Sequence, residues 1–382
     1  MFIEKIHMDA QDEITGAKIL SVKTKKPNIT TPARAAQNSW CSAFRKDKEC
    51  FGKALPNSWI ELSNKIPNET EMKNTIEKLG ERADYLKSLN VPFRRKHVIE
   101  YFPTMGNEVK YGLNGKEKIT TLINLGIFSK ADVIGIPDFN ENLSLFREKI
   151  QFSEKLILSH PEGQNLDYIP YVRSDSRKFK DKLNIIMNED INKIGIDYRG
   201  FSGVSQTNFN RLQNFKRDLD KDILLKVGHL PRKIYSTNAS VPHLMYYFLA
   251  DITADRVNNP PLYMYDNKQK KIPPRDIDTV EYFSSSDLGI IKEDALPPHF
   301  GTDCNCPYHT KERYNKQNKF FTNNGDEMGH RSKICEMFSS NLECQRSQIA
   351  IKQDNFLNYL RSKKCIKATL DLNNNSLDSF LH

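Results

Sequence analysis

Five short apolar runs constrain the fold of this chain more than any other feature of its sequence. They are HVIEYF at 97–102, DVIGIPDF at 132–139, YIPYV at 168–172, KIGIDYRG at 193–200 and DILLKVG at 222–228. Nearly continuous apolar runs are typical of parallel strands that are buried on both faces. Stretches with helical character lie before and between them, at 65–90, 141–160, 177–191 and 205–222. This alternation predicts an α/β fold, and the number of repeats favours a TIM-type (β/α)8 barrel.

Polar side chains recur where these predicted strands end. They are Glu100, Asp138, Arg173, Asp175 and Asp197. The carboxyl ends of parallel barrel strands share one face, so we expect these side chains to meet at a common mouth. An aspartate at such a position also caps the helix that follows, and that interpretation stays open for each residue taken alone.

A cluster of metal-ligand residues lies far downstream. Cys304, Cys306 and His309 stand close together, and Cys335 follows after a gap of 25 residues. Three thiolates and one imidazole form a donor set that Zn²⁺ prefers, and four protein ligands leave no open position. The spacing therefore predicts a structural zinc site, with Cys335 opening a long amphipathic helix on which Leu342, Ile349 and Phe356 recur.

Two other fourth ligands and one simpler interpretation remain. His330 is the main rival to Cys335, and Cys344 is a weaker one. The simpler interpretation is that Cys335 is a buried core thiol, since cysteine is common in protein cores. The domain organisation that we expect is a barrel at 1–300, a zinc-binding region with a closing helix at 301–365, and a polar tail at 366–382.

Composition narrows the class of protein. The chain has 382 residues, of which 38% are hydrophobic and 27% are charged, as in soluble globular proteins. It has no apolar run that approaches a membrane span, and MFIEKIHMDAQDE does not resemble a secretory signal. We expect a cytoplasmic protein, in the host cytoplasm if a phage encodes it. Its seven cysteines, an odd number, suit reduced thiols better than a disulfide framework.

The charge balance favours a polyanionic partner. A formal net charge of +9 suits contact with phosphates, because lysine and arginine displace counterions from nucleic acids. Lys311, Arg313 and 94–96 are candidates for such contacts, although each could be a solvated surface charge. The chain contains neither a P-loop nor a G-x-G-x-x-G motif.

The cysteine spacing resembles that of the tRNA-guanine transglycosylase superfamily. That family has a zinc site of the form C-x-C-x-x-C-x25-H, and this chain reads C-x-C-x-x-H-x25-C. The segment from 335 to 360 is similar to the family's closing helix, with Glu343 and 350–351 at matching offsets. KILSVKTKKPNITTPA is similar to its first hairpin, which ends in a Thr-Pro pair, here Thr31 and Pro32.

The resemblance also implies roles for individual residues. LADITADR looks like the segment that ends in the nucleophilic aspartate, which places that role on Asp255, with Asp251 as the alternative. ADVIGIPDF looks like the strand whose aspartate reads guanine, here Asp138. IDYRGFSGV stands where the family has a glycine-rich loop under the base, which implies Gly200 and Gly203 as substrate contacts.

Two departures from the family pattern shape the predicted function. The motif Asp-Ser-Gly-Gly-Phe-Gln, which carries the family's other catalytic carboxylate, is missing, and Glu100 in VIEYFPTMG is the nearest strand end. The glutamine of the base pocket is missing too, since its strand reads YVRSD and ends with Arg173. With these two features missing, the sequence resembles the DNA-acting DpdA-type branch of the superfamily more than the tRNA-acting enzymes.

The predicted function is exchange of guanine in DNA for a 7-deazaguanine that resembles preQ0, through a covalent aspartyl-sugar intermediate. Asp255, Asp138 and Glu100 are the predicted catalytic residues, and Asp138, Asp197, Gly200, Gly203 and Arg173 the predicted substrate contacts. The alternatives are the same chemistry on tRNA, or a zinc-braced barrel that binds nucleic acid or a partner subunit without turnover. A homodimer and helper proteins stay open, and no membrane partner is expected.

Overall fold

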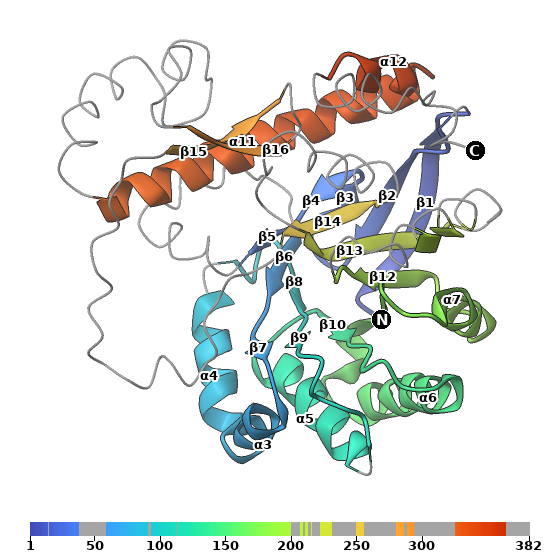
Figure 1. Cartoon of the computed structure of the whole chain (residues 1–382), viewed down its shortest axis with the longest axis vertical. Coiled ribbons are helices and arrows are strands. Elements are labelled where there is room, and N and C mark those ends of the chain that lie inside the picture. The colour runs from blue at the N-terminus through green and yellow to red at the C-terminus, as the bar shows by residue number, and fades with distance from the viewer. Residues whose placement is uncertain are drawn as a thin grey trace.

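The centre of the molecule is a parallel β-sheet that nearly closes on itself (Figure 1). In the computed structural model of the chain its strands are β4 (Ala33–Arg34), β5 (Ala36–Gln37), β6 (Trp59–Leu62), β8 (Val98–Tyr101), β10 (Val133–Ile136), β11 (Asp167–Arg173), β12 (Lys193–Asp197), β13 (Leu224–Leu230) and β14 (Ile252–Asp255). The structure describes residues 1–13, 15–37, 59–90, 93–112, 114–199, 207–208, 211–212, 215, 222–230, 250–255, 280–285, 289–293 and 325–363.

The strand order shows how the sheet closes. It runs β4-β14-β13-β12-β11-β10-β8-β6-β5, and each neighbouring pair is parallel. β4 and β5, at the two ends of this order, belong to one segment, 33–37, so the order starts and finishes on the same stretch of chain. The predicted α/β class and barrel-like sheet are therefore confirmed, including all five strands predicted from the apolar runs.

Helices cover the outside of this sheet (Figure 1). They are α3 (Glu69–Glu77), α4 (Leu79–Asn90), α5 (Gly115–Phe128), α6 (Leu143–Ser159) and α7 (Phe179–Asn188), with a short 3-10 turn η1 (Gly163–Asn165) after α6. Asparagine side chains start two of them, because Asn68 accepts a hydrogen bond from the Glu71 amide and Asn142 accepts one from the Leu145 amide. The helical character predicted at 65–90 is confirmed from Glu69 on, as two helices that Lys78 separates, whereas 65–66 forms a strand.

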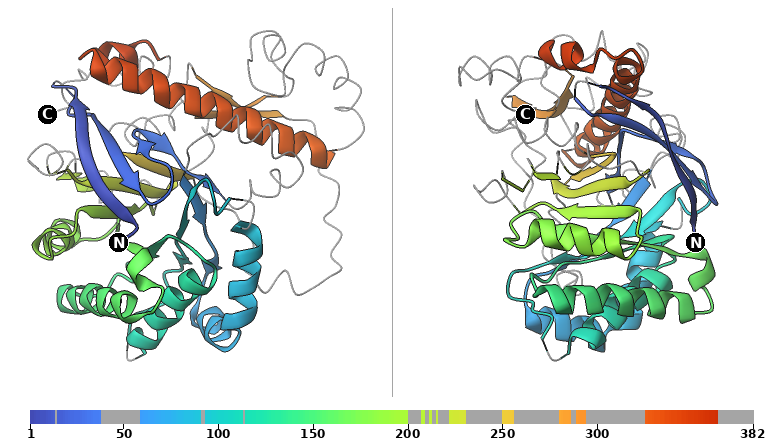
Figure 2. Two further views of the ribbon diagram at one scale, coloured as in Figure 1. Left: turned by 180° about the vertical axis from the view of Figure 1, so that it is seen from behind. Right: turned by 90° about the vertical axis from the view of Figure 1, so that its right-hand side faces the viewer.

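The amino-terminal strands close one end of the barrel. β1 (Ile3–Gln11), β2 (Lys18–Thr24) and β3 (Ile29–Thr30) form an antiparallel sheet, and Figure 2 shows β1 and β2 in dark blue reaching from the barrel towards the carboxyl-terminal helices. The Ile3 amide donates to Asp167 at 3.0 Å, and Lys26 pairs with Asp132 at 2.5 Å. Both aspartates stand at the amino ends of barrel strands, so this sheet covers the end opposite to the mouth.

The long carboxyl-terminal helix packs against this assembly. α11 (Gly325–Lys352) is followed by α12 (Phe356–Arg361), and Arg34 of the barrel pairs with Glu336 of α11 at 2.8 Å. β15 (Val280–Ser284) and β16 (Gly289–Glu293) form a hairpin beside α11, and β7 (Lys65–Ile66) and β9 (Thr104–Met105) form a small parallel pair. The expectation that Cys335 opens the helix is wrong, because α11 begins at Gly325.

The buried face of α11 also differs from the predicted apolar stripe. Ile349 is 55% exposed and Phe356 lies beyond the end of α11, whereas the buried positions include Ser340, Glu343 and Ser347. Small and polar side chains face inward because Glu343 is the centre of a hydrogen-bond cluster. It accepts from Ser285 of the hairpin and from Tyr359 and Lys363 at the end of the chain's described part.

Glycines inside the barrel make room for two aromatic rings. Phe102 and Tyr171 stack in the interior with ring centroids 3.7 Å apart. A Cβ atom on Gly195 would stand 2.5 Å from Tyr171, and one on Gly135 would stand 2.6 Å from Phe102. The glycines in the predicted strands therefore serve packing of the barrel interior.

We expect Gly195→Ala to lower the free energy of unfolding by about 1–3 kcal/mol, because the added methyl group overpacks the ring of Tyr171. Urea denaturation would measure the loss. Gly80→Ala is the matched control, since a Cβ at Gly80 meets no atom within 4 Å, and it should leave stability unchanged or slightly higher. Equal stability of the two variants would contradict this account of the interior.

Candidate active site at the barrel mouth

Three of the polar residues predicted at the mouth lie at the carboxyl ends of neighbouring strands, whereas Glu100 lies in the barrel interior. Asp138 follows β10, Arg173 ends β11 and Asp197 ends β12, and the three strands are neighbours in the sheet. Asp255 ends β14 by its backbone position, and its side chain lies outside the described residues. Because all these strands are parallel, the four positions share one end of the barrel. Gly200 and Gly203 lie outside the described residues.

The structure separates Asp251 from Asp255. Asp251 directly precedes β14 and is buried, and it accepts a hydrogen bond from the Leu225 amide at 2.7 Å. It therefore stands at the amino end of the strand, away from the mouth. Of the two aspartates considered as nucleophile, only Asp255 occupies a position at the carboxyl end.

Asp138 is fully buried and bound on both carboxylate oxygens. Lys182 of α7 donates to them at 2.7 and 2.9 Å, the Arg173 amide donates at 3.1 Å and the Asn140 amide at 2.7 Å. Burial alone would raise the pKa of Asp138, but Lys149 and Lys182 lower it below its ordinary value. In this arrangement Asp138 is an ionised anchor for the loop after β10.

Glu100 lies deeper, in the barrel interior, within a buried ion cluster. Lys226 of β13 contacts both Glu100 of β8 and Glu61 of β6. Trp59 and Tyr171 donate to Glu100 at 2.6 and 2.7 Å, so both of its oxygens are bound. We name Lys226, Glu61 and Glu100 the central cluster. Glu100 is 0% exposed, and its role in this arrangement is to hold three other side chains in place.

Glu61 is the carboxylate of the central cluster with the fewest partners. Its Oε1 atom is buried and has no hydrogen-bond partner among the described residues. Burial and the neighbouring Glu100 raise the pKa of Glu61 above its ordinary value, although Lys226 acts in the opposite direction. The cluster thus places two carboxylates around one ammonium group.

A second group at the mouth was not predicted from the sequence. His229 near the end of β13 contacts Asp197 through Nδ1 at 2.6 Å and Thr104 of β9 through Nε2 at 2.7 Å. Burial would raise the pKa of Asp197, but Arg199 and His229 lower it below its ordinary value. Arg199 Nε donates to the same carboxylate at 2.7 Å.

A longer strand assignment would have found His229. The apolar run in the sequence ends at 228, whereas β13 continues to Leu230, so the rule that polar residues mark strand ends includes His229 once the strand has its full length. Lys226 carried a signal as well, because a lysine inside a buried strand requires a carboxylate partner. The partners themselves, Glu61 and Glu100, are on other strands.

Arg173 is engaged by a neighbour. Its guanidinium forms two hydrogen bonds with Asp175, at 2.9 and 2.8 Å. Asp175 is one of the polar residues predicted at the mouth, so the structure brings this pair together as an ion pair beside Asp138.

The predicted zinc ligands are not tested by the described part of the chain. Cys304, Cys306 and His309 lie outside the described residues, and Cys335 and His330 are placed only as positions within α11. Cys344 is buried in α11 and forms no disulfide. Among the described residues, no group of three or more His, Cys, Asp or Glu side chains is arranged to hold a metal ion.

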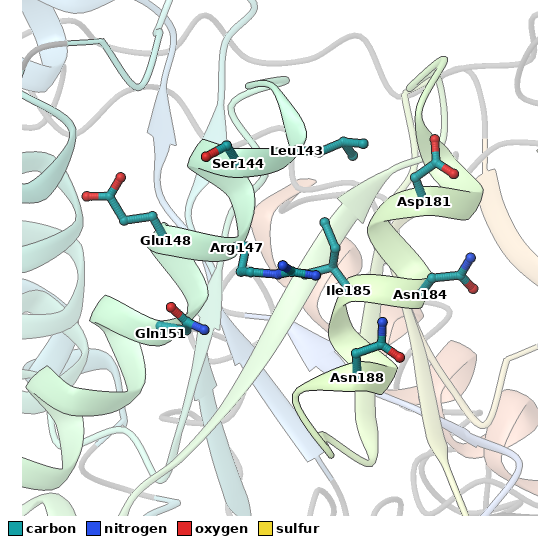
Figure 3. Close-up of a pocket in the computed structure, with 9 residues that line it drawn as sticks. All are labelled: Leu143, Ser144, Arg147, Glu148, Gln151, Asp181, Asn184, Ile185 and Asn188. Carbon is teal, nitrogen blue, oxygen red and sulfur yellow. The ribbon is translucent and has the colours of Figure 1, made fainter.

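One hollow on the described surface lies between two helices on the outside of the barrel. A groove of about 530 Å³ runs between α6 and α7 on the outside of the barrel (Figure 3). Its lining includes Arg147, Glu148, Gln151, Asp181, Asn184 and Asn188. We assign no chemistry to it, because the polar residues at the strand ends lie elsewhere. No described helix combines the length and apolar character needed to span a membrane.

Comparison with known proteins leaves the family open. No protein-family model matches this chain, and no curated protein matches it either. The function must therefore be argued from the residues and their arrangement.

The two glutamates of the central cluster should respond differently to the same substitution. Glu100→Gln should lower the free energy of unfolding by about 1–3 kcal/mol, because its amide nitrogen would face donors that now bind a carboxylate. Glu61→Gln should cost less, because one oxygen of Glu61 has no partner.

The pH dependence gives a sharper test. A raised pKa means that the folded state holds the Glu61 proton more tightly than the unfolded chain does. The resulting stability is fully present below the ordinary value of 4.5 and is lost as the pH rises through the raised folded value. Glu61→Gln cannot titrate, so its stability relative to the unaltered protein should increase as the pH rises. Urea denaturation between pH 4.5 and about pH 8 measures this difference, and a difference that stays constant would contradict it.

Proposed function

We propose that this protein is a nucleic-acid guanine transglycosylase that exchanges guanine for a 7-deazaguanine resembling preQ0 in DNA. The observation that carries the proposal is the shared end of the parallel strands, where the position of Asp255 stands at the same end of the barrel as Asp197 and His229. The strand register pairs Asp255 with Leu230, the residue after His229. A proposed nucleophile therefore stands beside a histidine that is bound to a carboxylate.

Base exchange without cleavage of the nucleic-acid backbone needs a carboxylate on the sugar. The Asp255 carboxylate forms a bond to the anomeric carbon as the glycosidic bond breaks, and the bonding electrons leave with guanine, which gains a proton. The incoming deazaguanine then attacks that carbon through its ring nitrogen and loses its proton, and Asp255 is released. The two steps together consume no net proton.

The proposed role of Asp138 in reading the base depends on whether its carboxylate is released by its present partners. A carboxylate that reads guanine accepts hydrogen bonds from the ring N–H and the exocyclic amine. Both oxygens of Asp138 already bind Lys182, so Asp138 reads a base only when Lys182 moves aside. Glu100 has three donors already, and its general acid or base role would require that the central cluster opens.

The substrate polymer must present an unpaired nucleoside. A duplex hides its glycosidic carbons, so the target is flipped out of the stack at a cost of a few kcal/mol that phosphate contacts offset. The net charge of +9 supports such contacts. Gly200 and Gly203 are the proposed floor of the base pocket, and Arg173 with Asp197 its polar edge.

Zinc is proposed as a structural ion only. Cys304, Cys306, His309 and Cys335 supply three thiolates and one imidazole, a donor set that fits Zn²⁺. The ion would brace the region before α11 against that helix, and the proposed chemistry proceeds without it.

We expect Asp255→Asn to abolish base exchange, because an amide is a poor nucleophile towards the sugar. Incorporation of radiolabelled guanine into DNA and into tRNA, measured side by side, tests this. Asp84→Asn makes the same chemical change on the exposed face of α4 and should exchange guanine at the unaltered rate. Exchange that persists in Asp255→Asn refutes the nucleophile.

The same assay separates the alternatives. Label in tRNA but not in DNA would select the tRNA reaction. Binding of either polymer with no label in either would select the zinc-braced binding module, a function that the fully occupied carboxylates of Asp138 and Glu100 would suit.

Elemental analysis tests the zinc proposal. The purified protein should contain one zinc per chain, and Cys335→Ala should lose it whereas His330→Ala should keep it, because only the first removes a proposed ligand. Zinc lost in His330→Ala instead would move the fourth ligand. A protein without zinc would remove the site altogether.

A further inference from the structure

Four side chains from different elements form one hydrogen-bonded chain at the barrel mouth. Asp197 ends β12, His229 lies near the end of β13, Thr104 begins β9, and Ser63 follows β6. Asp197 Oδ1 lies 2.6 Å from His229 Nδ1, His229 Nε2 lies 2.7 Å from Thr104 Oγ1, and Thr104 Oγ1 lies 3.1 Å from Ser63 Oγ.

The backbone at His229 is unusual for a residue other than glycine. Its φ angle is 62°, in the left-handed region, and the pairing of β13 with β14 is irregular between Val227 and Leu230. Such a conformation is maintained only when the surroundings over-determine it, and it occurs preferentially at functional sites. This irregularity sets the direction of the His229 side chain at the end of the strand.

Three contacts fix the orientation of the imidazole ring. The ring of Phe102 stacks on it with centroids 4.8 Å apart. Asp197 is ionised and accepts only, so the proton on Nδ1 belongs to His229 and Nε2 faces Thr104. Arg199 holds the other oxygen of Asp197 in place. This leaves Nε2 as the atom through which the ring exchanges a proton.

The solvent exposure of the four hydrogen-bonded residues differs. Ser63, Asp197 and His229 are 3%, 1% and 3% exposed, whereas Thr104 is partly exposed. Thr104 is also held by the backbone, because its amide donates to Asn64 at 2.8 Å. Thr104 is therefore the residue of the four that has surface for a substrate at the mouth to contact.

We propose that Asp197, His229 and Thr104 form a proton relay for base exchange, in which Thr104 is the catalytic residue that contacts the base and His229 acts through it. This inference rests on the function proposed above and adds to it the source of the proton. None of the residues first expected to carry acid and base work at the mouth is a histidine.

The proton balance of the relay closes over one turnover. When the glycosidic bond breaks, Thr104 donates its hydroxyl proton to the departing guanine and takes one from Nε2 of the imidazolium, which leaves a neutral ring. When the deazaguanine attacks, its ring N–H proton passes to Thr104, and the threonine returns a proton to Nε2. His229 ends the cycle as it began, with Nδ1 bound to Asp197 throughout.

Other charges face the relay. Glu61 of the central cluster interacts electrostatically with His229, and Arg199 and Arg173 interact with Asp197. A purely structural histidine would occupy the same place with the same contacts. The two roles can be separated by a small azole that replaces the missing ring of a His229 variant. A structural role requires only that the azole has the shape of the ring, whereas a proton relay also requires that the azole is basic.

The test is rescue of His229→Gly by free azoles. Glycine tolerates the left-handed backbone at this position, so the variant removes the ring without backbone strain. We expect its turnover to fall about 10²- to 10⁴-fold with little change in KM, and we expect imidazole to restore it to a degree that follows azole basicity. The turnover of Thr104→Val should decrease by a similar factor, and imidazole should not restore it.

Lys130→Gly is the matched control. Lys130 also has a φ angle of 62°, and it lies on the surface in the turn between α5 and β10. This variant should exchange bases at the unaltered rate with or without imidazole. Equal rescue of His229→Gly by strongly and weakly basic azoles would overturn the relay. Turnover of His229→Gly within a few-fold of the unaltered protein, without any azole, would overturn it too.

A second measurement does not depend on activity. In the ¹⁵N-histidine spectrum of the full chain, the relay predicts a strongly hydrogen-bonded Nδ1 proton that disappears in His229→Gly and shifts in Asp197→Asn. Absence of that proton overturns the relay alone. If the proton is present but the unaltered protein exchanges no guanine in DNA or tRNA, the proposed function is refuted. The role of the relay in base exchange is then refuted as well.

Discussion

The barrel depends on one buried ammonium group. Lys226 of β13 lies between Glu61 of β6 and Glu100 of β8, and Trp59 and Tyr171 complete the hydrogen bonds of Glu100. An unpaired charge at this depth would be strongly destabilising, so a strand that slipped in register would leave the ammonium or a carboxylate without its partner. The central cluster therefore specifies how distant strands align, which two-sided apolar strands specify poorly by themselves.

The two ends of the barrel have different tasks. The amino end is covered by β1 and β2, and Asp167 and Asp132 bind that sheet. At the other end lie Asp138 just after β10, Thr104 of β9, Asp197 of β12 and His229 of β13. α11 binds Ser285 of the β15–β16 hairpin through Glu343, and its Gln348 donates to the backbone carbonyls of Thr30 and Pro32 beside the amino-terminal sheet (Figure 2). The polar strand-end residues that the structure describes therefore lie at the end opposite to the amino-terminal sheet.

Sequence patterns predicted the strands well because burial on both faces requires apolar residues over the whole strand. They also placed Asp138, Arg173 and Asp197 at the correct end, since parallel strands share a direction. They did not predict partners, because Lys182 and Asp138 are far apart in the chain and meet only after the helix docks. They missed His229 because neither a left-handed residue nor an irregular strand pairing shows in local composition. The inward face of α11 was misassigned because polar residues around Glu343 occupy it.

The hydrogen bonds that the buried carboxylates already accept determine which residues at the mouth are suited to acid and base chemistry. A carboxylate that accepts several N–H groups is stabilised as the anion, and proton transfer to it would leave those donors facing a neutral acid. Asp138 is of this kind, and both oxygens of Glu100 are bound by other side chains. A histidine with one nitrogen fixed by a carboxylate keeps the other for exchange, and the proton reaches the surface through a hydroxyl that both donates and accepts. The contacts at the mouth therefore favour His229 and Thr104 over the buried acids as the route by which a proton enters and leaves.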